Sequence, residues 1–517
     1  MKFKIFTSLL VMLAISVTAF AQKPASISVD KPITPIFIDQ KENQVLKVEV
    51  LTTGEQVNAE KLEVLMNPAS VSKVHQVRLY SSGDDNEFST DYKLGAEDAS
   101  ETVTFSFDEQ LEQGRNFFWV SVELNDSATL TDQIVINTST MSVNGELLKA
   151  ESDRPNAPLK TAVKVRKTGD DDVDTYRIPG IVTSNEGTLL AVYDVRYDNS
   201  SDLQGDIDVG LSRSTDGGET WEPMEIIMNM EEWGGKPHSQ NGIGDPAILV
   251  DRNTGTIWVA ALWIHGYPDT HAWFSSQQGI EPEETGQFVL VKSEDDGKTW
   301  SESINITEQI KQPEWHLLLM GPGNGITMED GTLVFAAQYK DENELPYSTI
   351  VYSYDRGETW EIGTPVRSNT TEAQVVELEK GRLMINMRDN RGGARSIYTT
   401  SDMGETWTEH ESSRTLLQEP VSMASLIKSN EPRKNYGHNY LLFSNPNSTA
   451  ARVNMTLKLS KDYGESWPLE NQLLLDEKQG FGYSSLTMVN EHTVGILYEG
   501  VRDLYFQKVP LYQLLDR

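Results

Sequence analysis

One short turn recurs five times along this chain and ends each time in tryptophan. All five copies have the form Ser/Thr-x-Asp-x-Gly-x-Ser/Thr-Trp, begin 47 to 79 residues apart, and are called box turns below. They are Ser214–Trp221, Ser293–Trp300, Ser353–Trp360, Thr400–Trp407 and Ser460–Trp467. Asp and Ser/Thr side chains hydrogen-bond the backbone of a tight turn, Gly takes the positive-φ position, and Trp packs against the sheet. A turn that returns at such intervals predicts a repeated structural unit.

The segments between the box turns have the composition of β-strands. Typical examples are Thr188–Tyr193, Thr332–Ala337 and Thr493–Tyr498, and several follow a turn that contains glycine, as hairpins prefer. No long amphipathic helix interrupts them. From about Ala162 to the C-terminus, the sequence therefore predicts an all-β domain built from four-stranded blades, each of which needs roughly 50 to 60 residues including its connections.

The N-terminal third of the sequence lacks the box turn. Residues 22–150 instead contain short stretches that alternate apolar and polar residues, such as Val45–Leu51 and Thr102–Phe107. This pattern predicts a small β-sandwich domain. Its role stays open between carbohydrate binding and a packing spacer. Residues 151–161, polar and with two prolines, are expected to form a linker before the repeat domain over 162–517.

The first 21 residues have the features of a secretory signal peptide. Lys2 and Lys4 precede the apolar run Leu9–Ile15, and Ala19-Phe-Ala21 has the small-x-small form of a cleavage site. The chain contains no cysteine, which excludes disulfides, zinc-thiolate sites and lipid attachment through a thiol. We therefore expect a secreted or periplasmic protein after cleavage near Ala21.

The charge balance excludes two classes of partner. The formal net charge is −34, from 44 basic and 78 acidic side chains. Such a surface repels nucleic acid and anionic lipid, so we expect no nucleic-acid partner, no membrane insertion and a monomeric protein. A site for an anionic ligand would require arginines gathered locally.

Tyr176-Arg-Ile-Pro179 precedes the first box turn, and this combination resembles the bacterial exo-α-sialidase family. The resemblance covers about Ala162 to Arg517, roughly two thirds of the chain. It implies a six-bladed β-propeller that hydrolyses terminal sialic acid from glycans, glycoproteins or gangliosides, with no metal or organic cofactor. The same motifs occur in relatives that transfer sialic acid or form an intramolecular anhydro product, so the fate of the released sugar and the linkage preference stay open.

The resemblance implies three arginines that bind the carboxylate of sialic acid. By matching context they are Arg177, Arg388 in Ile385-Asn-Met-Arg-Asp389, and Arg452 in Ala451-Arg-Val-Asn-Met455. The physical chemistry supports this assignment independently. A guanidinium stays charged at any working pH and meets a carboxylate as a planar fork, whereas lysine presents only a point charge.

The resemblance also implies a catalytic pair. The nucleophile is Tyr483 in Gly482-Tyr-Ser-Ser-Leu486, and its base is Glu372 in Thr371-Glu-Ala-Gln-Val375. A free phenol has a pKa of about 10 and needs an adjacent base at neutral pH. A neutral phenol also approaches a carbon that bears a carboxylate without the repulsion that an Asp or Glu nucleophile would meet. Sialidases are the tyrosine exception among retaining glycosidases.

The acid/base is expected on the mobile loop after the first arginine. The family's spacing indicates Asp202, with Asp206 as the second candidate, while Arg196 and Asp245 match positions that contact the sugar ring near its 4-hydroxyl. No residue is assigned to the N-acetyl pocket, for which the sequence offers Ile243, Trp263, Trp273 and Phe274. A sialic-acid lectin without catalytic activity is disfavoured because Tyr483, Glu372 and all three arginines are present.

Overall fold

The computed structural model describes residues 25–54, 56–268, 270–429 and 439–515. The predicted signal peptide over 1–21 lies outside these residues. Within them the chain is almost entirely β, as expected, and the helices are single turns. They are α1 (Pro68–Val71), α2 (Ala272–Ser275), α3 (Thr307–Ile310) and α4 (Tyr512–Leu515). None of the helices in the described part of the chain has the length and apolar character needed to cross a bilayer.

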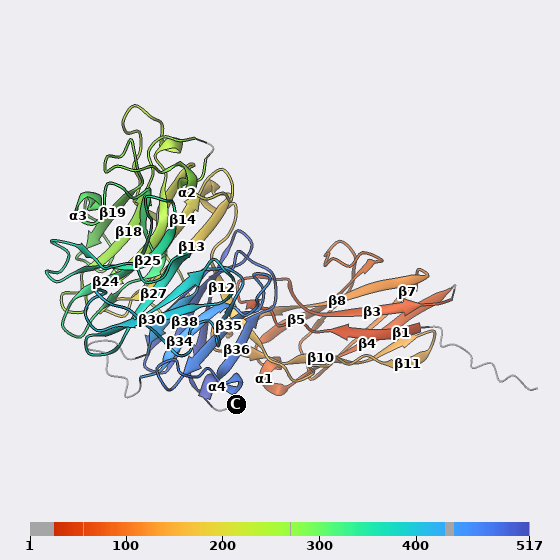
Figure 1. Ribbon diagram of the computed structural model, residues 1–517. Coiled ribbons are helices and arrows are strands. Elements are labelled where there is room, and N and C mark those ends of the chain that lie inside the picture. The colour runs from red at the N-terminus through yellow and green to blue at the C-terminus, as the bar shows by residue number, and fades with distance from the viewer. Residues whose placement is uncertain (1–24, 55, 269, 430–438, 516–517) are drawn as a thin grey trace, which may run out of the picture.

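The N-terminal domain is a sandwich of two antiparallel sheets, which projects from one side of the larger domain (Figure 1). The first sheet contains β1 (Ala25–Asp30), β3 (Asn43–Thr52), β8 (Gly114–Leu124), β5 (Val74–Gly83) and β6 (Lys93–Asp98). The second contains β11 (Glu146–Lys149), β10 (Ile136–Val143), β4 (Val57–Met66) and β7 (Thr102–Leu111). Alternate residues of β3 and β4, among them Val48, Val50, Leu62 and Val64, are fully buried and form the core. The period-two pattern of the sequence therefore corresponds to one buried face on each strand.

The larger domain is a β-propeller, and its first five blades follow one another along the chain (Figure 1). Blade 1 contains β13 (Thr175–Thr183), β14 (Leu189–Arg196), β15 (Ile207–Ser214) and β16 (Glu225–Met228). Blade 2 contains β17 (Ile243–Val250), β18 (Ile257–Trp263), β19 (Gln287–Ser293) and β20 (Ile304–Asn305), and β22 (Gly323–Asn324) pairs with β17. Blade 3 contains β21 (Leu317–Met320), β23 (Ile326–Thr327), β24 (Leu333–Lys340), β25 (Pro346–Ser353) and β26 (Glu361–Ile362).

Blade 4 contains β27 (Thr370–Glu379), β28 (Arg382–Asp389), β30 (Ser396–Thr400) and β31 (Thr408–Glu409). Blade 5 contains β33 (Ser425–Lys428), β34 (Leu441–Pro446), β35 (Met455–Ser460) and β36 (Gln472–Asp476). The short strands β29 (Gly393–Ala394) and β32 (Gln418–Glu419) pair beside blade 4. The first strands of neighbouring blades contact one another around the centre, for example β13 with β17 and β27 with β33.

The sixth blade closes the ring with strands from both ends of the domain. β37 (Ser484–Asn490), β38 (Thr493–Glu499) and β39 (Leu504–Pro510) pair in order, and β39 then pairs with β12 (Leu159–Arg166). This closure also explains why six blades carry five box turns in the described part of the chain. Each box turn joins the third strand of a blade to the fourth, and in the closing blade these two strands are not consecutive in sequence.

The box turns hold the blades together and present no tryptophan as a ligand platform. In the first copy, Asp216 accepts hydrogen bonds from the backbone N–H and hydroxyl of Thr220, and Ser214 accepts one from the N–H of Gly218. The other four copies repeat these bonds. All five tryptophans are buried or half-buried. The conserved geometry of the turn is therefore structural, as its residue types predict.

The sandwich and the propeller are joined by shared β-pairing. β2 (Ile36–Phe37) and β9 (Gln133–Ile134) of the N-terminal region both pair with β12, which begins within the expected linker over 151–161. Arg154 in that segment forms an ion pair with Glu477 of the propeller. In the sandwich, Tyr80, Phe117 and Trp119 are buried. These aromatic rings serve packing and are not displayed to solvent.

Candidate active site

Three of the predicted site residues, Arg177, Asp245 and Glu372, occur at equivalent places on the inner strands. β13, β17 and β27 each have a break in register at Arg177/Gly180, Gly244/Ala247 and Thr370/Ala373. Ile178 and Asp245, each followed by proline, have φ values of 56° and 55°. Bulges re-aim side chains, and a non-glycine residue at positive φ is strained, which is common at functional sites. The same bulge, repeated on three inner strands, therefore turns side chains from several blades toward one end of the ring.

Tyr483 lies at the centre of the three predicted carboxylate-binding arginines. The guanidinium carbons of Arg177 and Arg452 are each 5.4 Å from the centroid of its ring. Nη1 of Arg388 donates a hydrogen bond to its hydroxyl oxygen at 3.0 Å. The three arginines come from blades 1 and 4 and from the loop before β35 in blade 5, so only closure of the ring brings them together.

Tyr483, Glu372 and Arg388 form one hydrogen-bonded unit. The Tyr483 hydroxyl donates to Oε1 of Glu372, and Nη1 of Arg388 lies 2.5 Å from Oε2 of the same carboxylate. Burial raises the pKa of Tyr483, and the charge of Glu372 raises it further, while Arg388, Arg452 and Arg177 oppose this rise. The phenol is therefore neutral in the free protein, with a carboxylate in place to accept its proton.

The three arginines differ in their carboxylate partners. Arg177 contacts Glu499 and Asp202, and Arg388 contacts Glu372. Arg452 forms no ion pair with any carboxylate in the described ranges and donates instead to the backbone carbonyls of Phe481 and Val421, at 2.8 and 3.1 Å. Its charge is therefore the least neutralised of the three and is available to an anionic ligand.

Asp202 is held between two guanidinium groups. Its Oδ1 accepts from Nη1 of Arg177 at 3.0 Å and from Nη1 of Arg196 at 2.8 Å, although its side chain is 60% exposed. Desolvation inside the site disfavours ionisation of the Asp202 carboxyl even though much of the side chain is exposed, but the charges of Arg196 and Arg177 outweigh this effect. The pKa of Asp202 therefore lies below its ordinary value. In the free protein Asp202 is therefore a carboxylate.

Arg196 and Asp245 are organised by Asp194, which sequence reasoning missed. Oδ2 of Asp194 accepts from Nε and Nη2 of Arg196 at 3.1 and 2.8 Å, and its Oδ1 accepts from the backbone N–H of Asp245 at 2.8 Å. Burial, followed by the charges of Asp194 and Asp202, raises the pKa of Asp245. Asp194 stands two residues before Arg196, so the strand period of two places both on one face and could have revealed the pair.

Glu499 is a second residue that sequence reasoning missed. Its buried carboxylate accepts from Nε of Arg177 at 3.1 Å, from the N–H of Ile178 at 2.9 Å and from the N–H of Tyr483 at 2.9 Å. It therefore ties an arginine of blade 1 to the tyrosine of the closing blade. No local sequence signal marks it, because its partners lie 322 and 16 residues away.

The second acid candidate and the proposed N-acetyl residues lie in different surroundings. Asp206 contacts Nδ1 of His238 at 3.0 Å, and it forms no ion pair with an arginine in the described part of the chain. Ile243 and Trp263 are buried in the core between blades 1 and 2, whereas Trp273 is half-buried and Phe274 is 66% exposed. The structure thus brings Asp202, and not Asp206, to the arginines.

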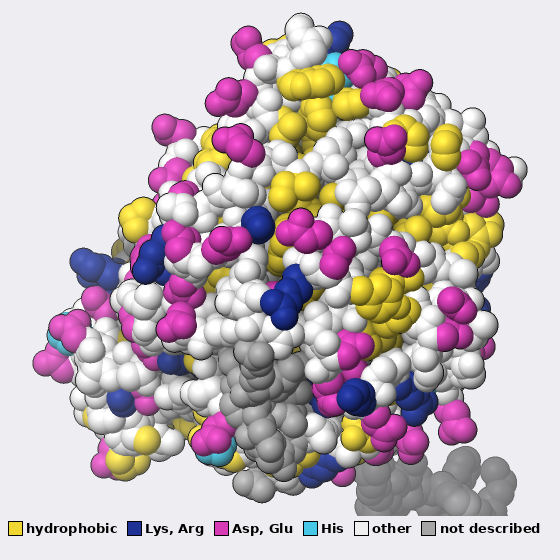
Figure 2. Space-filling view, turned by 90° about the vertical axis from the view of Figure 1, so that its left-hand side faces the viewer, with side chains coloured by type: hydrophobic (Ala, Val, Ile, Leu, Met, Phe, Trp, Pro, Cys, Tyr) yellow, Lys and Arg dark blue, Asp and Glu magenta, His cyan; other side chains and the backbone are white. Residues whose placement is uncertain are grey.

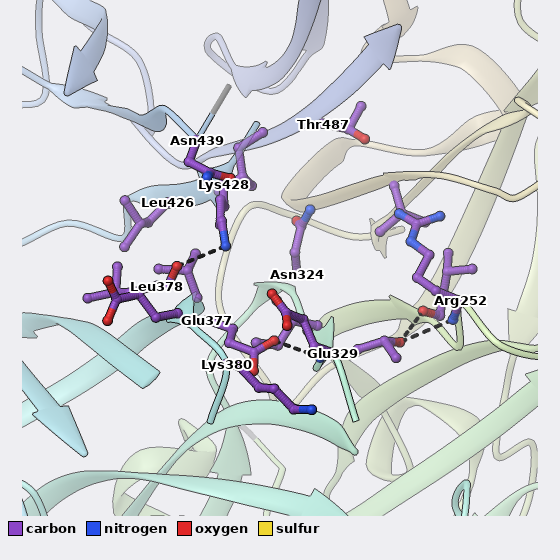
Figure 3. A pocket seen from close by; sticks show the side chains of 18 of the residues that line it. Arg252, Asn324, Glu329, Glu377, Leu378, Lys380, Leu426, Lys428, Asn439 and Thr487 are labelled. Carbon is purple, nitrogen blue, oxygen red and sulfur yellow. Dashed lines mark hydrogen bonds between the residues drawn. The ribbon is translucent and has the colours of Figure 1, made fainter. Parts of the chain in front are cut away.

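A cavity lies at the other end of the ring, away from the candidate site. It has a volume of about 650 Å3 and is lined by residues near the ends of inner strands, among them Val182, Val250, Glu377, Lys428 and Thr487 (Figure 3). Glu377 accepts from the N–H groups of Glu329 and Gly381, and Lys428 donates to the carbonyl of Leu378 at 2.8 Å. These groups serve the backbone, and none of the eight predicted site residues lines this cavity.

The electrostatic character of the site contrasts with the rest of the surface. Acidic side chains are spread over the face shown in Figure 2, whereas Lys and Arg are separate and few there. The candidate site gathers four arginines, namely Arg177, Arg196, Arg388 and Arg452. No cluster of three or more His, Cys, Asp or Glu side chains with metal-binding geometry occurs among the described residues. The four arginines are therefore suited to bind an anionic ligand.

The chain is similar to known proteins over nearly its whole length. Residues 178–499 match the family "BNR repeat-like domain", and residues 24–146 match "N-terminal domain of BNR-repeat neuraminidase". A sialidase of Bacteroides fragilis is 45% identical over 496 residues, which cover 92% of this chain and 91% of that protein. A sialidase of Clostridium perfringens is 33% identical and covers 66% of this chain and 91% of its own length. The solved structure of the Hadza microbial sialidase Hz136 has a TM-score of 0.89 at 44% identity, covering 94% of this chain and all of that one.

Proposed function

The chain belongs to the family of BNR-repeat neuraminidases, or sialidases, and from this premise we propose that it releases terminal sialic acid with retention of configuration through a covalent tyrosyl intermediate. It is an exo-α-sialidase, a glycoside hydrolase, and sialylated glycoconjugates are its substrates. The observation that carries the proposed mechanism is the hydrogen-bonded unit of Tyr483, Glu372 and Arg388, with two further arginines beside the tyrosine ring.

Substrate binding begins with the carboxylate of sialic acid. Arg177, Arg388 and Arg452 hold it, and the unpaired charge of Arg452 attracts it first. Because Asp202 occupies Nη1 of Arg177 in the free protein, the incoming carboxylate displaces Asp202 from this contact. Asp202 is thereby released toward the glycosidic oxygen. Arg196 and Asp245 border the sugar ring.

The first chemical step forms the glycosyl-enzyme. The Tyr483 oxygen attacks the anomeric carbon while its proton moves to Oε1 of Glu372. Loss of Arg177 to the substrate carboxylate raises the pKa of Asp202, which takes up a proton from solvent before the reaction. The bond from the anomeric carbon to the leaving oxygen breaks through an oxocarbenium-like transition state, and Asp202 transfers this proton to that oxygen. The raised pKa of Tyr483 makes its ionisation before attack unfavourable. Glu372 avoids this step because it accepts the proton during the attack.

The second step reverses these roles. Asp202, now a carboxylate, accepts a proton from water, and the water oxygen attacks the anomeric carbon. The bond to the Tyr483 oxygen breaks, and the phenol regains its proton from Glu372. Two displacements at one carbon leave the configuration of the sugar unchanged.

The proposal is tested by following the product during hydrolysis of an α-sialoside. We expect 1H NMR to show α-sialic acid first, before mutarotation converts it to the β form. β-Sialic acid as the first product would disprove the double displacement. An anhydro sugar, or sialic acid attached to an added acceptor sugar, would instead assign the chain to the intramolecular or transfer reactions.

The pH dependence should differ between the free enzyme and the substrate complex. Arg196 and Arg177 lower the pKa of Asp202 in the free protein, whereas the bound carboxylate takes Arg177 and adds a negative charge, which raises the pKa. A general acid works while protonated, so activity falls as pH rises through this pKa. The descending limb of kcat should therefore lie at higher pH than that of kcat/KM. Profiles measured with a poor leaving group check this, and coincident limbs, or limbs that persist in Asp202→Ala, would contradict it.

A further inference from the structure

Leu203 and Gln204, which follow Asp202, are fixed to blade 2 by backbone and side-chain contacts. Leu203 is 2% exposed and packs in the apolar core of blade 2 with Ile264 and Ala272. The backbone N–H of Ala272 donates to the carbonyl of Leu203 at 2.5 Å. A residue of blade 1 is thus anchored in blade 2, immediately beside the predicted acid.

Gln204 completes this anchor with its side-chain amide. Its Nε2 donates to the carbonyls of Ile264 and Gly266 at 2.8 and 2.7 Å, and its Oε1 accepts from the N–H groups of Gly242 and Gly205 at 3.0 and 3.1 Å. The residue is 8% exposed, and both ends of the amide are fully engaged. A buried amide with four hydrogen bonds fixes the local backbone strongly, because each lost bond leaves an unpaired polar group.

Gly242 of blade 2 lies so close to the segment after Asp202 that only glycine fits at this position. A Cβ at this position would lie 2.4 Å from the carbonyl oxygen of Gly205, 2.8 Å from Cδ2 of Leu203 and 2.9 Å from Oε1 of Gln204. No side chain other than hydrogen fits there without displacing the segment. The segment after Asp202 is therefore seated in a fitted socket formed by Gly242, Ile264, Gly266 and Ala272.

The anchor matters most when substrate is bound. In the free protein Asp202 is held by ionic contacts with Arg177 and Arg196. Under the proposed function, on which this inference rests, the substrate carboxylate takes Arg177 when Asp202 must align with the leaving oxygen. The contacts of Leu203 and Gln204 then restrain the acid together with Arg196, whose Nη1 donates to Oδ1 of Asp202.

We propose that Gln204 is a positioning residue for Asp202, which fixes the acid against the socket of Gly242, Ile264, Gly266 and Ala272 and thereby sets the efficiency of leaving-group protonation. Gln204 does not touch the reacting atoms and acts only through the backbone of its neighbour. Its loss therefore affects the step that requires proton donation, and spares steps that do not.

The test is Gln204→Met, which keeps the size of the side chain and removes all four hydrogen bonds. Two substrates are compared with wild type: a sialyl-lactose, whose leaving group needs protonation, and an activated aryl sialoside, whose leaving group does not. We expect kcat on sialyl-lactose to fall by about 100-fold, as for a misplacement of about 1 Å, with less than about 5-fold loss on the aryl substrate. Binding of the 2,3-didehydro analogue of sialic acid should stay within about 3-fold, because the arginines are intact.

Gln287→Met is the matched control. Gln287 is 1% exposed and donates to the carbonyls of Ile280 and Thr285 at 3.0 and 2.8 Å, but among the described residues it makes no hydrogen bond with residues 202–206. It should lower the melting temperature and leave the ratio of the two rates unchanged. Gln204→Glu is the second variant, since it keeps the acceptor oxygen for Gly242 and loses the donors, and it should show the same selective loss.

Equal losses on both substrates, or no loss on either, in a folded Gln204 variant would overturn the positioning role. Failure of wild type to release sialic acid from either substrate would instead overturn the proposed function. The two results are separated by the wild-type rates, which are measured first.

Discussion

Replacement of Tyr483 by phenylalanine is expected to lower kcat on sialyl-lactose by about 1000-fold or more, which corresponds to about 4 kcal/mol in the barrier. The variant removes the one oxygen that lies between Glu372 and Arg388 and keeps the ring that contacts Arg177 and Arg452. The nucleophile is lost while the shape of the site is kept. Turnover numbers and inhibitor binding, measured on the same preparation, separate these effects.

Binding of the 2,3-didehydro analogue to this variant should stay within about 10-fold of wild type, because the carboxylate contacts are made by the arginines. Tyr352→Phe is the matched control. The Tyr352 hydroxyl also donates to a glutamate, Glu361, at 3.3 Å, but on β25 away from the site, and its loss should leave kcat unchanged. A Tyr483→Phe enzyme with at least a tenth of the wild-type rate on sialyl-lactose would show that the tyrosine oxygen is not the nucleophile.

Replacement of Arg388 by lysine is expected to lower kcat/KM by about 100-fold or more, although the formal charge is kept. Nη1 of Arg388 serves Glu372 and Tyr483 together, and the planar fork has further donors for the substrate. The ammonium group of a lysine side chain is a single donor centre and cannot contact Glu372, Tyr483 and the substrate at the same time. Glu372 is then left in the site without its arginine partner. Truncation of one member of such a pair costs roughly 2 to 5 kcal/mol.

The effects on kcat and KM should distinguish Arg388 from Arg452. Because Arg388 also orients the catalytic pair, Arg388→Lys should lower kcat as well as raise KM. Arg452→Lys should act mainly on KM, since Arg452 donates its hydrogen bonds to the backbone carbonyls of Phe481 and Val421 and not to the catalytic pair. Arg213→Lys, on the outer part of blade 1 beside Glu222 and Asp296, serves as the control with unchanged kinetics. An effect of Arg388→Lys on KM alone would contradict its place in the catalytic unit.

The fold could be predicted from the sequence because its signals are local. The hydrogen bonds of each box turn join residues at most four positions apart, so eight residues contain the whole motif. The alternation in the first 150 residues likewise reflects a pleat with a period of two. The boundary between the two domains was less well specified, because β12 is a strand of the propeller whose partners, β2, β9 and β39, lie far away in sequence.

The candidate site was predicted from motifs, and the structure brings those residues together around Tyr483. The motifs did not identify the residues that hold the site residues in place. Gln204 and Glu499 have no distinctive sequence context, and Asp194 is marked only by its spacing from Arg196. All three also bind partners on another blade. Two of the residues considered for the N-acetyl pocket, Ile243 and Trp263, have suitable residue types but are buried in the hydrophobic core.

The sequence alone therefore determined the repeated blade, the all-β class and the positions of the arginines, the acid and the tyrosine along the chain. Only the tertiary structure decided which carboxylate each arginine faces, how Asp202 is anchored, and that Tyr483 meets Glu372 across 111 residues. The physical reason is the closure of the ring. Turn and strand preferences are set by neighbouring residues, whereas the charges of the site interact only after β12 has joined β39 and the inner strands have met at the centre.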